Sequence, residues 1–207
     1  MRTPGFPSRP CCARAQIPGV ELSPWLSDDT AQPAAGSLFP RSYCEASMVD
    51  IPHALRRKII PAADLPAYPG PRPLVFTNGV FDVLHRGHVA YLIEARELGA
   101  ALLVAINSDV SARLQGKGPD RPLNVELDRL MVMAALECVS WVTLFDDKTP
   151  CELLRRCRPE IYVKGGDYDM EALEETRLVR AWGGRSVAIP FTAGYSTTAL
   201  VQRIRGA

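Results

Sequence analysis

Residues 74–88 read Leu-Val-Phe-Thr-Asn-Gly-Val-Phe-Asp-Val-Leu-His-Arg-Gly-His, and this stretch decides the fold. It begins with an apolar run that leads into Asn78-Gly79, a pair typical of turns, so we expect a strand over residues 74–77. Apolar residues then recur at helical spacing, which predicts a helix over residues 87–98. The stretch is therefore a strand-to-helix junction, and it holds two of the three histidines of the chain.

The junction carries the pattern His-x-Gly-His at His85, Gly87 and His88. A glycine between two histidines lets the backbone approach a ligand closely, and the unpaired N–H groups of a helix start favour an anion. The pattern predicts a phosphate site with two imidazole donors. One alternative is a helix start with capping or solvated histidines. A metal site is another, because residues three apart share a helix face, but zinc is disfavoured without a third ligand at the usual spacing.

The rest of the chain predicts four more strands in alternation with helices. Strands are expected at residues 101–106, 141–145, 161–163 and 186–191, and helices at 50–60, 124–137, 150–157, 171–182 and 196–205. Residues 101–106 are apolar throughout, as in a strand that is buried on both faces of a parallel sheet. This alternation predicts an α/β fold with a Rossmann-like, doubly wound parallel sheet of about five strands.

Polar clusters follow the predicted strands. They comprise Thr77-Asn78, Asn107-Ser108-Asp109, Lys164-Gly165-Gly166-Asp167 and the segment Thr192–Thr198. Ligands of such sheets bind at the carboxyl ends of the strands, near the switch point of the topology, so we expect one shared site there. Glu126 and Arg129 lie three residues apart on a predicted helix, where a surface ion pair is the simplest interpretation.

Several motifs together carry a family resemblance. Residues 77–88, Thr-Asn-Gly-x-Phe-Asp-x-Leu-His-x-Gly-His, resemble the nucleotidyltransferase superfamily that includes the cytidylyltransferases. Val-Lys-Gly-Gly-Asp-Tyr at 163–168, Asn-Ser-Asp at 107–109 and Gly-x-Ser-Thr-Thr at 194–198 make residues 50–206 similar to the heptose 1-phosphate adenylyltransferases. The glycerol-phosphate cytidylyltransferases are similar in fold but typically carry Arg-Thr-Glu-Gly before Ser-Thr-Thr, where this chain has Phe-Thr-Ala-Gly.

The resemblance implies an enzyme that transfers AMP from ATP to D-glycero-β-D-manno-heptose 1-phosphate, giving ADP-heptose and pyrophosphate for the inner core of lipopolysaccharide. It implies catalytic roles for His85, His88 and Lys117, the last on a polar loop. The nucleotide-binding residues implied are Thr77, Asn78, Gly79, Phe81, Gly87, Arg129, Lys164, Gly165, Gly166, Asp167, Ser196, Thr197 and Thr198. Resemblance and strand-end position together assign Asp82, Asn107, Asp109 and Arg121 to the sugar phosphate. Mg²⁺ is expected to bridge the phosphates without a protein metal site.

Two other functions stay open: a cytidylyltransferase for a polyol phosphate, and a nucleotide-binding module without turnover. A net charge of +1 gives no electrostatic case for nucleic acid or an anionic membrane. No apolar run approaches the roughly 18 residues that span a bilayer. Six cysteines without a C-x-x-C pair indicate a reduced, cytoplasmic protein. The resemblance implies a homo-oligomer, a dimer or larger.

Residues 1–47 differ in composition from the rest of the chain. They are rich in Pro, Ser, Ala and Gly and show no sustained periodicity. Such a segment cannot bury enough apolar surface to offset its ordering entropy. We therefore expect residues 1–47 to be a disordered or mis-assigned N-terminal extension, followed by a nucleotidyltransferase domain at residues 48–207.

Overall fold

The computed structural model describes residues 51–67, 70–116, 118, 120–166, 168–190 and 194–206, all within the structural unit that ends at Ala207. The predictions for residues 1–47, for Lys117 and for Asp167 lie outside the described residues. They stay predictions, as does the domain boundary at residue 48.

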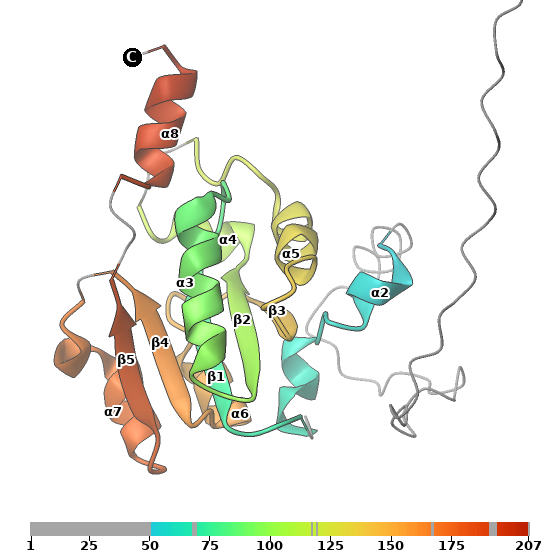
Figure 1. Cartoon of the computed structure of the whole chain (residues 1–207), viewed down its shortest axis with the longest axis vertical. Helices are drawn as coiled ribbons and strands as arrows, with labels where there is room; N and C mark the ends of the chain where they lie inside the picture. The colour runs from blue at the N-terminus through green and yellow to red at the C-terminus, as the bar shows by residue number, and fades with distance from the viewer. Residues whose placement is uncertain are drawn as a thin grey trace, which may run out of the picture. The chain divides into compact units, whose positions relative to one another are not determined.

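Five parallel strands form one sheet in the order β3-β2-β1-β4-β5 (Figure 1). Their bounds are β1 Leu74–Gly79, β2 Ala101–Asn107, β3 Trp141–Phe145, β4 Ile161–Gly165 and β5 Arg185–Ile189. The chain adds β2 and β3 on one side of β1 and then crosses over to add β4 and β5 on the other. The predicted doubly wound sheet is confirmed, and its order reverses between β1 and β4, where such folds place a ligand.

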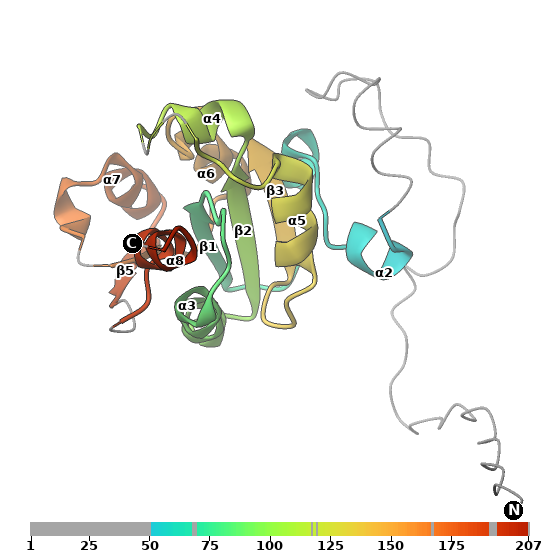
Figure 2. The ribbon, with the colours of Figure 1, turned by 90° about the horizontal axis from the view of Figure 1, so that it is seen from above.

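Helices cover both faces of the sheet (Figure 2). Helices α3 (Arg86–Glu97) and α5 (Glu126–Ala134) contribute to one apolar cluster, whereas α6 (Cys151–Cys157), α7 (Glu174–Arg180) and the 3₁₀ helix η2 (Ala62–Ala67) contribute to the other. Successive strand residues point to opposite faces. Val75 of β1 therefore joins Leu92 of α3 in the first cluster, while Phe76 joins Leu154 of α6 in the second.

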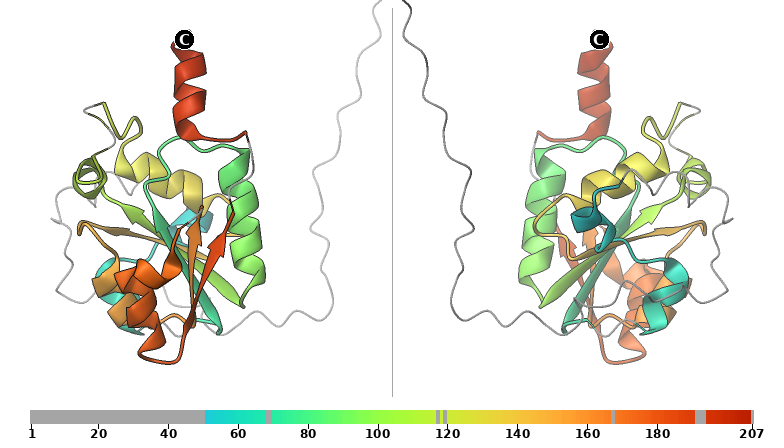
Figure 3. Two further views of the ribbon diagram at one scale, coloured as in Figure 1. Left: turned by 90° about the vertical axis from the view of Figure 1, so that its left-hand side faces the viewer. Right: turned by 90° about the vertical axis from the view of Figure 1, so that its right-hand side faces the viewer.

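Four short elements complete the described fold: α2 (His53–Arg56), α4 (Asp109–Arg113), the 3₁₀ helix η3 (Met170–Ala172) and α8 (Thr197–Ile204). Helix α8 has no buried residue and extends beyond the edge formed by the carboxyl ends of the strands (Figure 3). None of the helices in the described ranges is both long enough and apolar enough to cross a membrane.

The predicted helix at 50–60 is wrong in extent, because only α2 is helical there. Ile59 instead forms an isolated parallel bridge with Val142 of β3, so pairing with the sheet edge replaces the expected helical turns. Gly99 follows the end of α3, and its φ is not in the left-handed region. A Cβ atom at Gly99 would lie 2.6 Å from the carbonyl oxygen of Pro73, so close packing is what requires glycine here.

Two further predicted helices are shorter than expected. The helix predicted at 124–137 begins at Glu126, because the backbone N–H of Asn124 donates to the Asp82 carboxylate. The helix predicted at 171–182 is divided into η3 and α7 at Leu173, whose ψ of 133° is extended rather than helical. Both differences lie near the carboxyl ends of the strands, where long-range contacts override local helical preference.

Candidate active site

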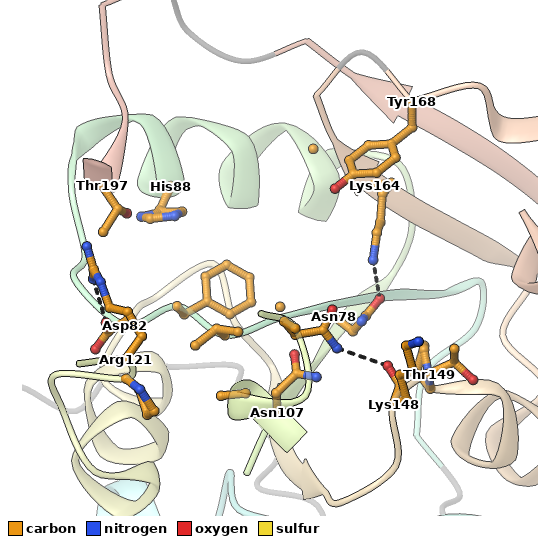
Figure 4. A pocket seen from close by; sticks show the side chains of 18 of the residues that line it. Asn78, Asp82, His88, Asn107, Arg121, Lys148, Thr149, Lys164, Tyr168 and Thr197 are labelled. Carbon is orange, nitrogen blue, oxygen red and sulfur yellow. Dashed lines mark hydrogen bonds and ion pairs between the residues drawn. The ribbon is translucent and has the colours of Figure 1, made fainter. Parts of the chain in front are cut away.

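A cavity of about 710 Å³ opens at the carboxyl ends of the strands (Figure 4). Side chains from the ends of β1, β2 and β4 line it, together with residues of α3, α7 and the start of α8. The predicted site residues that it brings together are Asn78, Gly79, Phe81, Asp82, His88, Asn107, Arg121, Lys164, Gly165, Thr197 and Thr198. The strand-end clusters of the sequence therefore meet at one edge.

The other described residues of the predicted site do not line this cavity. They are Thr77, His85, Gly87, Asp109, Arg129, Gly166 and Ser196. Thr77 is fully buried, and its hydroxyl pairs with that of Tyr91. The Ser196 hydroxyl accepts from the N–H of Ala199, 3.0 Å away, so it caps α8. His85 and Ser196 line a separate hollow of about 280 Å³ beside the start of α8.

The switch point between β1 and β4 is bridged by Asn78. Its side-chain oxygen accepts hydrogen bonds from the Tyr162 hydroxyl at 3.1 Å and from the Lys164 ammonium at 3.0 Å. Figure 4 shows the second of these contacts across the cavity floor. Because an ammonium can only donate, the Lys164 contact determines the orientation of the amide. The Asn78 NH₂ group is thereby presented as a donor at the strand end.

The two histidines occupy different positions. His85 is the N-cap of α3 with extended backbone at φ −143°, whereas His88 lies in the first turn and lines the cavity. Their rings stack with centroids 3.9 Å apart and an interplanar angle of 21°. Burial lowers the pKa of His85 below its ordinary value, which favours the neutral imidazole.

Phe81 also contacts the His88 ring. The two ring centroids lie 5.6 Å apart at an interplanar angle of 65°, an edge-to-face contact. Phe81 has a φ of 48°, a left-handed conformation that is uncommon for a large side chain. Such strained residues cluster at functional sites. The backbone after β1 is thus bent in a way that positions an aromatic ring against His88.

Gly87 lies where an added side chain would meet two neighbouring side chains. A Cβ atom there would lie 3.0 Å from Cε1 of His85 and 3.0 Å from Cβ of Tyr195. The side chains of His85 and Tyr195 therefore approach the Gly87 backbone closely. The missing side chain lets the segment before α8 pack against the start of α3, so the two helix N-termini are drawn together.

Asp82 and Arg121 form a partly buried ion pair at one end of the cavity. The Arg121 guanidinium lies 2.6 Å from the Asp82 carboxylate, which also accepts from the N–H groups of Leu123 and Asn124. Burial opposes ionisation of Asp82, but these backbone donors and Arg121 outweigh it and hold the pKa below its ordinary value. The pair thus fastens the loop before α5 over the end of β1.

The predicted surface pair of Glu126 and Arg129 is wrong. Arg129 is 1% exposed, and its guanidinium donates to the carbonyl oxygens of Val80 at 2.6 Å and Asn107 at 2.8 Å and to the Asp109 carboxylate at 2.8 Å. Asp109 and Arg129 are therefore committed to joining the loop after β1 to the loop after β2. Their observed contacts are structural and lie behind the cavity wall.

Four polar residues that line the cavity were missed by the sequence-based site assignment: Gln115, Lys148, Thr149 and Glu175. Lys148 and Thr149 follow β3, and the same strand-end rule that found the other clusters would have found them. The Gln115 side chain donates to the Lys148 carbonyl oxygen at 3.0 Å, which ties α4 to this loop. Glu175 lies on α7 and carries no strand-end signal.

The cavity combines features that suit a polyphosphate. His88, Arg121, Lys148 and Lys164 place donors or positive charge in its wall, and the N-terminal turns of α3 and α8 contribute lining residues. Preorganised donors of this kind stabilise charge that develops on phosphoryl oxygens. The arrangement is therefore equipped to hold a nucleotide and to assist phosphoryl-group chemistry.

A family model described as cytidylyltransferase-like matches residues 76–203. The chain belongs to the cytidylyltransferase-like family and is a nucleotidyltransferase. The family resemblance drawn from the strand-to-helix motif is thereby confirmed.

The names of similar proteins are more specific than the family description. The chain is 62% identical over 135 residues to D-beta-D-heptose 1-phosphate adenylyltransferase of Bordetella bronchiseptica, across 65% of this chain and 83% of that protein. It is 50% identical over 133 residues to the bifunctional protein HldE of Trichlorobacter lovleyi, across 64% of this chain but 27% of that protein. A solved lipopolysaccharide core biosynthesis protein from Thermoplasma volcanium gives 28% identity and a TM-score of 0.49, covering 57% of this chain and 95% of that one.

Proposed function

We propose that the protein transfers AMP from ATP to a heptose 1-phosphate and releases ADP-heptose and pyrophosphate. The observation that carries this proposal is the 62% identity to the Bordetella adenylyltransferase over 83% of its length. The cavity supports it, because donors from α3, α8 and β4 converge where the fold places a nucleotide. The D-glycero-β-D-manno form of the sugar follows from the family resemblance.

The proposed reaction is a direct displacement at the α-phosphorus of ATP. An oxygen of the sugar phosphate forms the new P–O bond while the bond between the α-phosphorus and its β-bridging oxygen breaks, and pyrophosphate leaves on the opposite side. The acceptor is already an anion, so no protein nucleophile or base is needed. The protein then acts by positioning both substrates and by stabilising charge on the phosphoryl oxygens.

The residues at the His88 end of the cavity are assigned to the phosphates. His88 and Thr197 come from different helices and both line this end (Figure 4), so together they can hold the departing pyrophosphate. His85 stacks on His88 and positions its ring. We assign Lys117 as a loop clamp on the phosphates, and the segment Gly165-Gly166-Asp167 to the ribose and base.

Mg²⁺ is the cofactor that this chemistry calls for. Groups of three or more His, Cys, Asp or Glu side chains suited to a metal do not occur among the described residues, and the Asp82 and Asp109 carboxylates are already paired with arginines. The donor set fits a cation that enters with the nucleotide and keeps phosphate and water ligands. When bound, the cation would neutralise charge on the phosphates.

We also propose a cytoplasmic homo-oligomer. Val110, Leu114, Leu123 and Val125 are each about half exposed or more, at 60%, 55%, 49% and 54%, which suits a subunit contact. The cysteines in the described part of the chain, Cys138, Cys151 and Cys157, are free thiols, as in a reducing compartment. Light scattering after size exclusion tests the assembly: a dimer or larger supports it, and a monomer at micromolar concentration contradicts it.

Pyrophosphate release tests the reaction. Purified protein with Mg²⁺ and heptose 1-phosphate should release pyrophosphate with ATP and not with CTP. Release with CTP alone would instead establish a cytidylyltransferase, as the family description permits. A nucleotide-binding module without turnover would release no pyrophosphate with either nucleotide across a panel of sugar and polyol phosphates. ATP would still raise its melting temperature.

A further inference from the structure

Glu175 is a carboxylate in the cavity wall for which the proposed mechanism has no use. It lines the cavity although only 8% of the residue is exposed. Within the described ranges its side chain makes no ion pair or hydrogen bond, and its carboxylate oxygens are not fully buried, so they are open to the cavity. A charged group in so largely buried a residue gains from a partner. An unpaired carboxylate in a substrate cavity therefore points to a group on the substrate.

The position of Glu175 separates it from the phosphate end. It lies on α7, which packs on the sheet face opposite to α3, whereas His88 comes from α3. Glu175 also acts on Cys151 at the start of α6: burial, and after it the Glu175 charge, raise the pKa of that thiol. Lys148 and Thr149, just before α6, line the same cavity.

The geometry of an in-line displacement indicates which substrate lies near Glu175. The attacking oxygen must approach the α-phosphorus from the side opposite to the departing pyrophosphate. If His88 and Thr197 hold the pyrophosphate, the acceptor enters from the side of α6 and α7. That is the side on which Lys148, Thr149 and Glu175 lie. The acceptor, and not the departing pyrophosphate, then meets Glu175.

The chemistry of this side matches a sugar phosphate. A carboxylate accepts hydrogen bonds and donates none, so it repels phosphate and pairs with hydroxyl groups. The Lys148 ammonium, on a residue that lines the same cavity, attracts an anion. Together these groups suit a ligand that carries one phosphate and several hydroxyls, which is what a sugar 1-phosphate presents.

We propose that Glu175 and Thr149 form the subsite for the ring hydroxyls of the acceptor sugar, with Lys148 facing its phosphate. This inference rests on the proposed function and deepens it. Glu175 binds substrate and takes no part in bond making. It makes the enzyme select a polyhydroxylated acceptor over a phosphate of similar charge with fewer hydroxyls.

Steady-state kinetics of Glu175→Ala and Glu175→Gln test the subsite, with Glu174→Ala as the matched control. Glu174 is the adjacent carboxylate on α7, but its side chain is 59% exposed and makes a 3.9 Å contact with Arg155. Loss of hydrogen bonds to a charged acceptor should raise the KM for the sugar phosphate roughly 10- to 100-fold in both Glu175 variants. The KM for ATP should change by no more than about twofold, and the Glu174 variant should match the wild type.

The outcomes separate this inference from the proposed function. An unchanged acceptor KM in folded Glu175 variants overturns the subsite and leaves the adenylyltransferase standing. A raised KM for ATP, or a raised requirement for Mg²⁺, overturns it too, because Glu175 would then face the nucleotide or its cation. If the wild type ignores heptose 1-phosphate but uses another polyol phosphate, the proposed function fails, and the same comparison on that acceptor decides the subsite. ATP-dependent thermal stabilisation of each variant confirms folding.

Discussion

The imidazole rings of His85 and His88 lie in face-to-face contact, 3.9 Å between centroids, at the first turn of α3. Two imidazolium ions at this distance would repel each other, and burial lowers the pKa of His85. The neutral form of His85 is therefore favoured, and its ring supports His88 by stacking on it. One histidine faces the cavity and the other holds it in place.

Replacement of His88 by alanine should lower kcat by roughly 10²- to 10³-fold, the effect of removing one preorganised donor. The melting temperature should change little, since the His88 side chain lines an open cavity. Stopped assays of pyrophosphate release with ATP check this, with His88→Asn as a control that keeps a donor. A folded alanine variant with wild-type kcat would remove His88 from the mechanism.

Lys117 is predicted to clamp the phosphates from a loop that is polar in sequence. Lys117→Ala should therefore lower kcat/KM for ATP, by an amount comparable to loss of one charge-assisted hydrogen bond, about tenfold or more. Lys148→Ala is the useful comparison, because Lys148 is assigned to the acceptor and should change the acceptor KM instead. Wild-type kinetics of Lys117→Ala would show that Lys117 does not contact the phosphates.

Arg129 is predicted to act in stability and not in nucleotide binding. Arg129→Met leaves the partly buried Asp109 carboxylate and three carbonyl oxygens without their donor, so unfolding should be easier by about 3–5 kcal/mol. Urea denaturation measures this free energy, and Arg113→Met, at an exposed position of α4, should be near neutral. A normally stable Arg129 variant with a raised KM for ATP would show that the nucleotide contacts Arg129 after all.

Asp82 gives a pH-dependent contribution to stability. Its pKa is held below the ordinary value, so the folded state binds its proton later than the unfolded state does as the pH falls. The stabilisation is complete above the unfolded pKa of about 3.9 and is lost as the pH falls from there through the folded pKa. Asp82→Asn should be about 1–3 kcal/mol less stable than the wild type at pH 7.

The difference in unfolding free energy between the wild type and Asp82→Asn, measured in urea at a series of pH values, should narrow below about pH 4. Asp146→Asn, at an exposed position after β3, is the matched control and should show no such convergence. A wild-type advantage over Asp82→Asn that stays constant through that range would contradict the assignment of the stabilisation to the ionised Asp82 carboxylate.

The sheet was predictable from sequence because its strands are short apolar runs followed by polar turns. Residues 101–106 of β2, for example, are fully buried in the structure, as their composition indicates. The positions of the histidines were harder to predict. Spacing of three implies one helix face only if both residues are helical, and His85 is an extended N-cap.

The contacts of Arg129 could not be read from its neighbours in sequence. Its acceptors at Val80 and Asn107 belong to two other loops, and only the folded sheet brings those loops together. Glu175 was missed for a related reason. A helical glutamate is ordinarily solvated, and its burial follows from how α7 packs beside the cavity.

Transfer of label from α-³²P-ATP tests the central claim most directly. Wild-type protein incubated with labelled ATP, Mg²⁺ and heptose 1-phosphate should place the label in ADP-heptose in a single turnover, with one pyrophosphate released for each product. His88→Ala should give the same product more slowly, and omission of the sugar phosphate should leave the label in ATP. Label that attaches to the protein, or that enters product only when it is supplied as α-³²P-CTP, would contradict direct adenylyl transfer to the sugar phosphate.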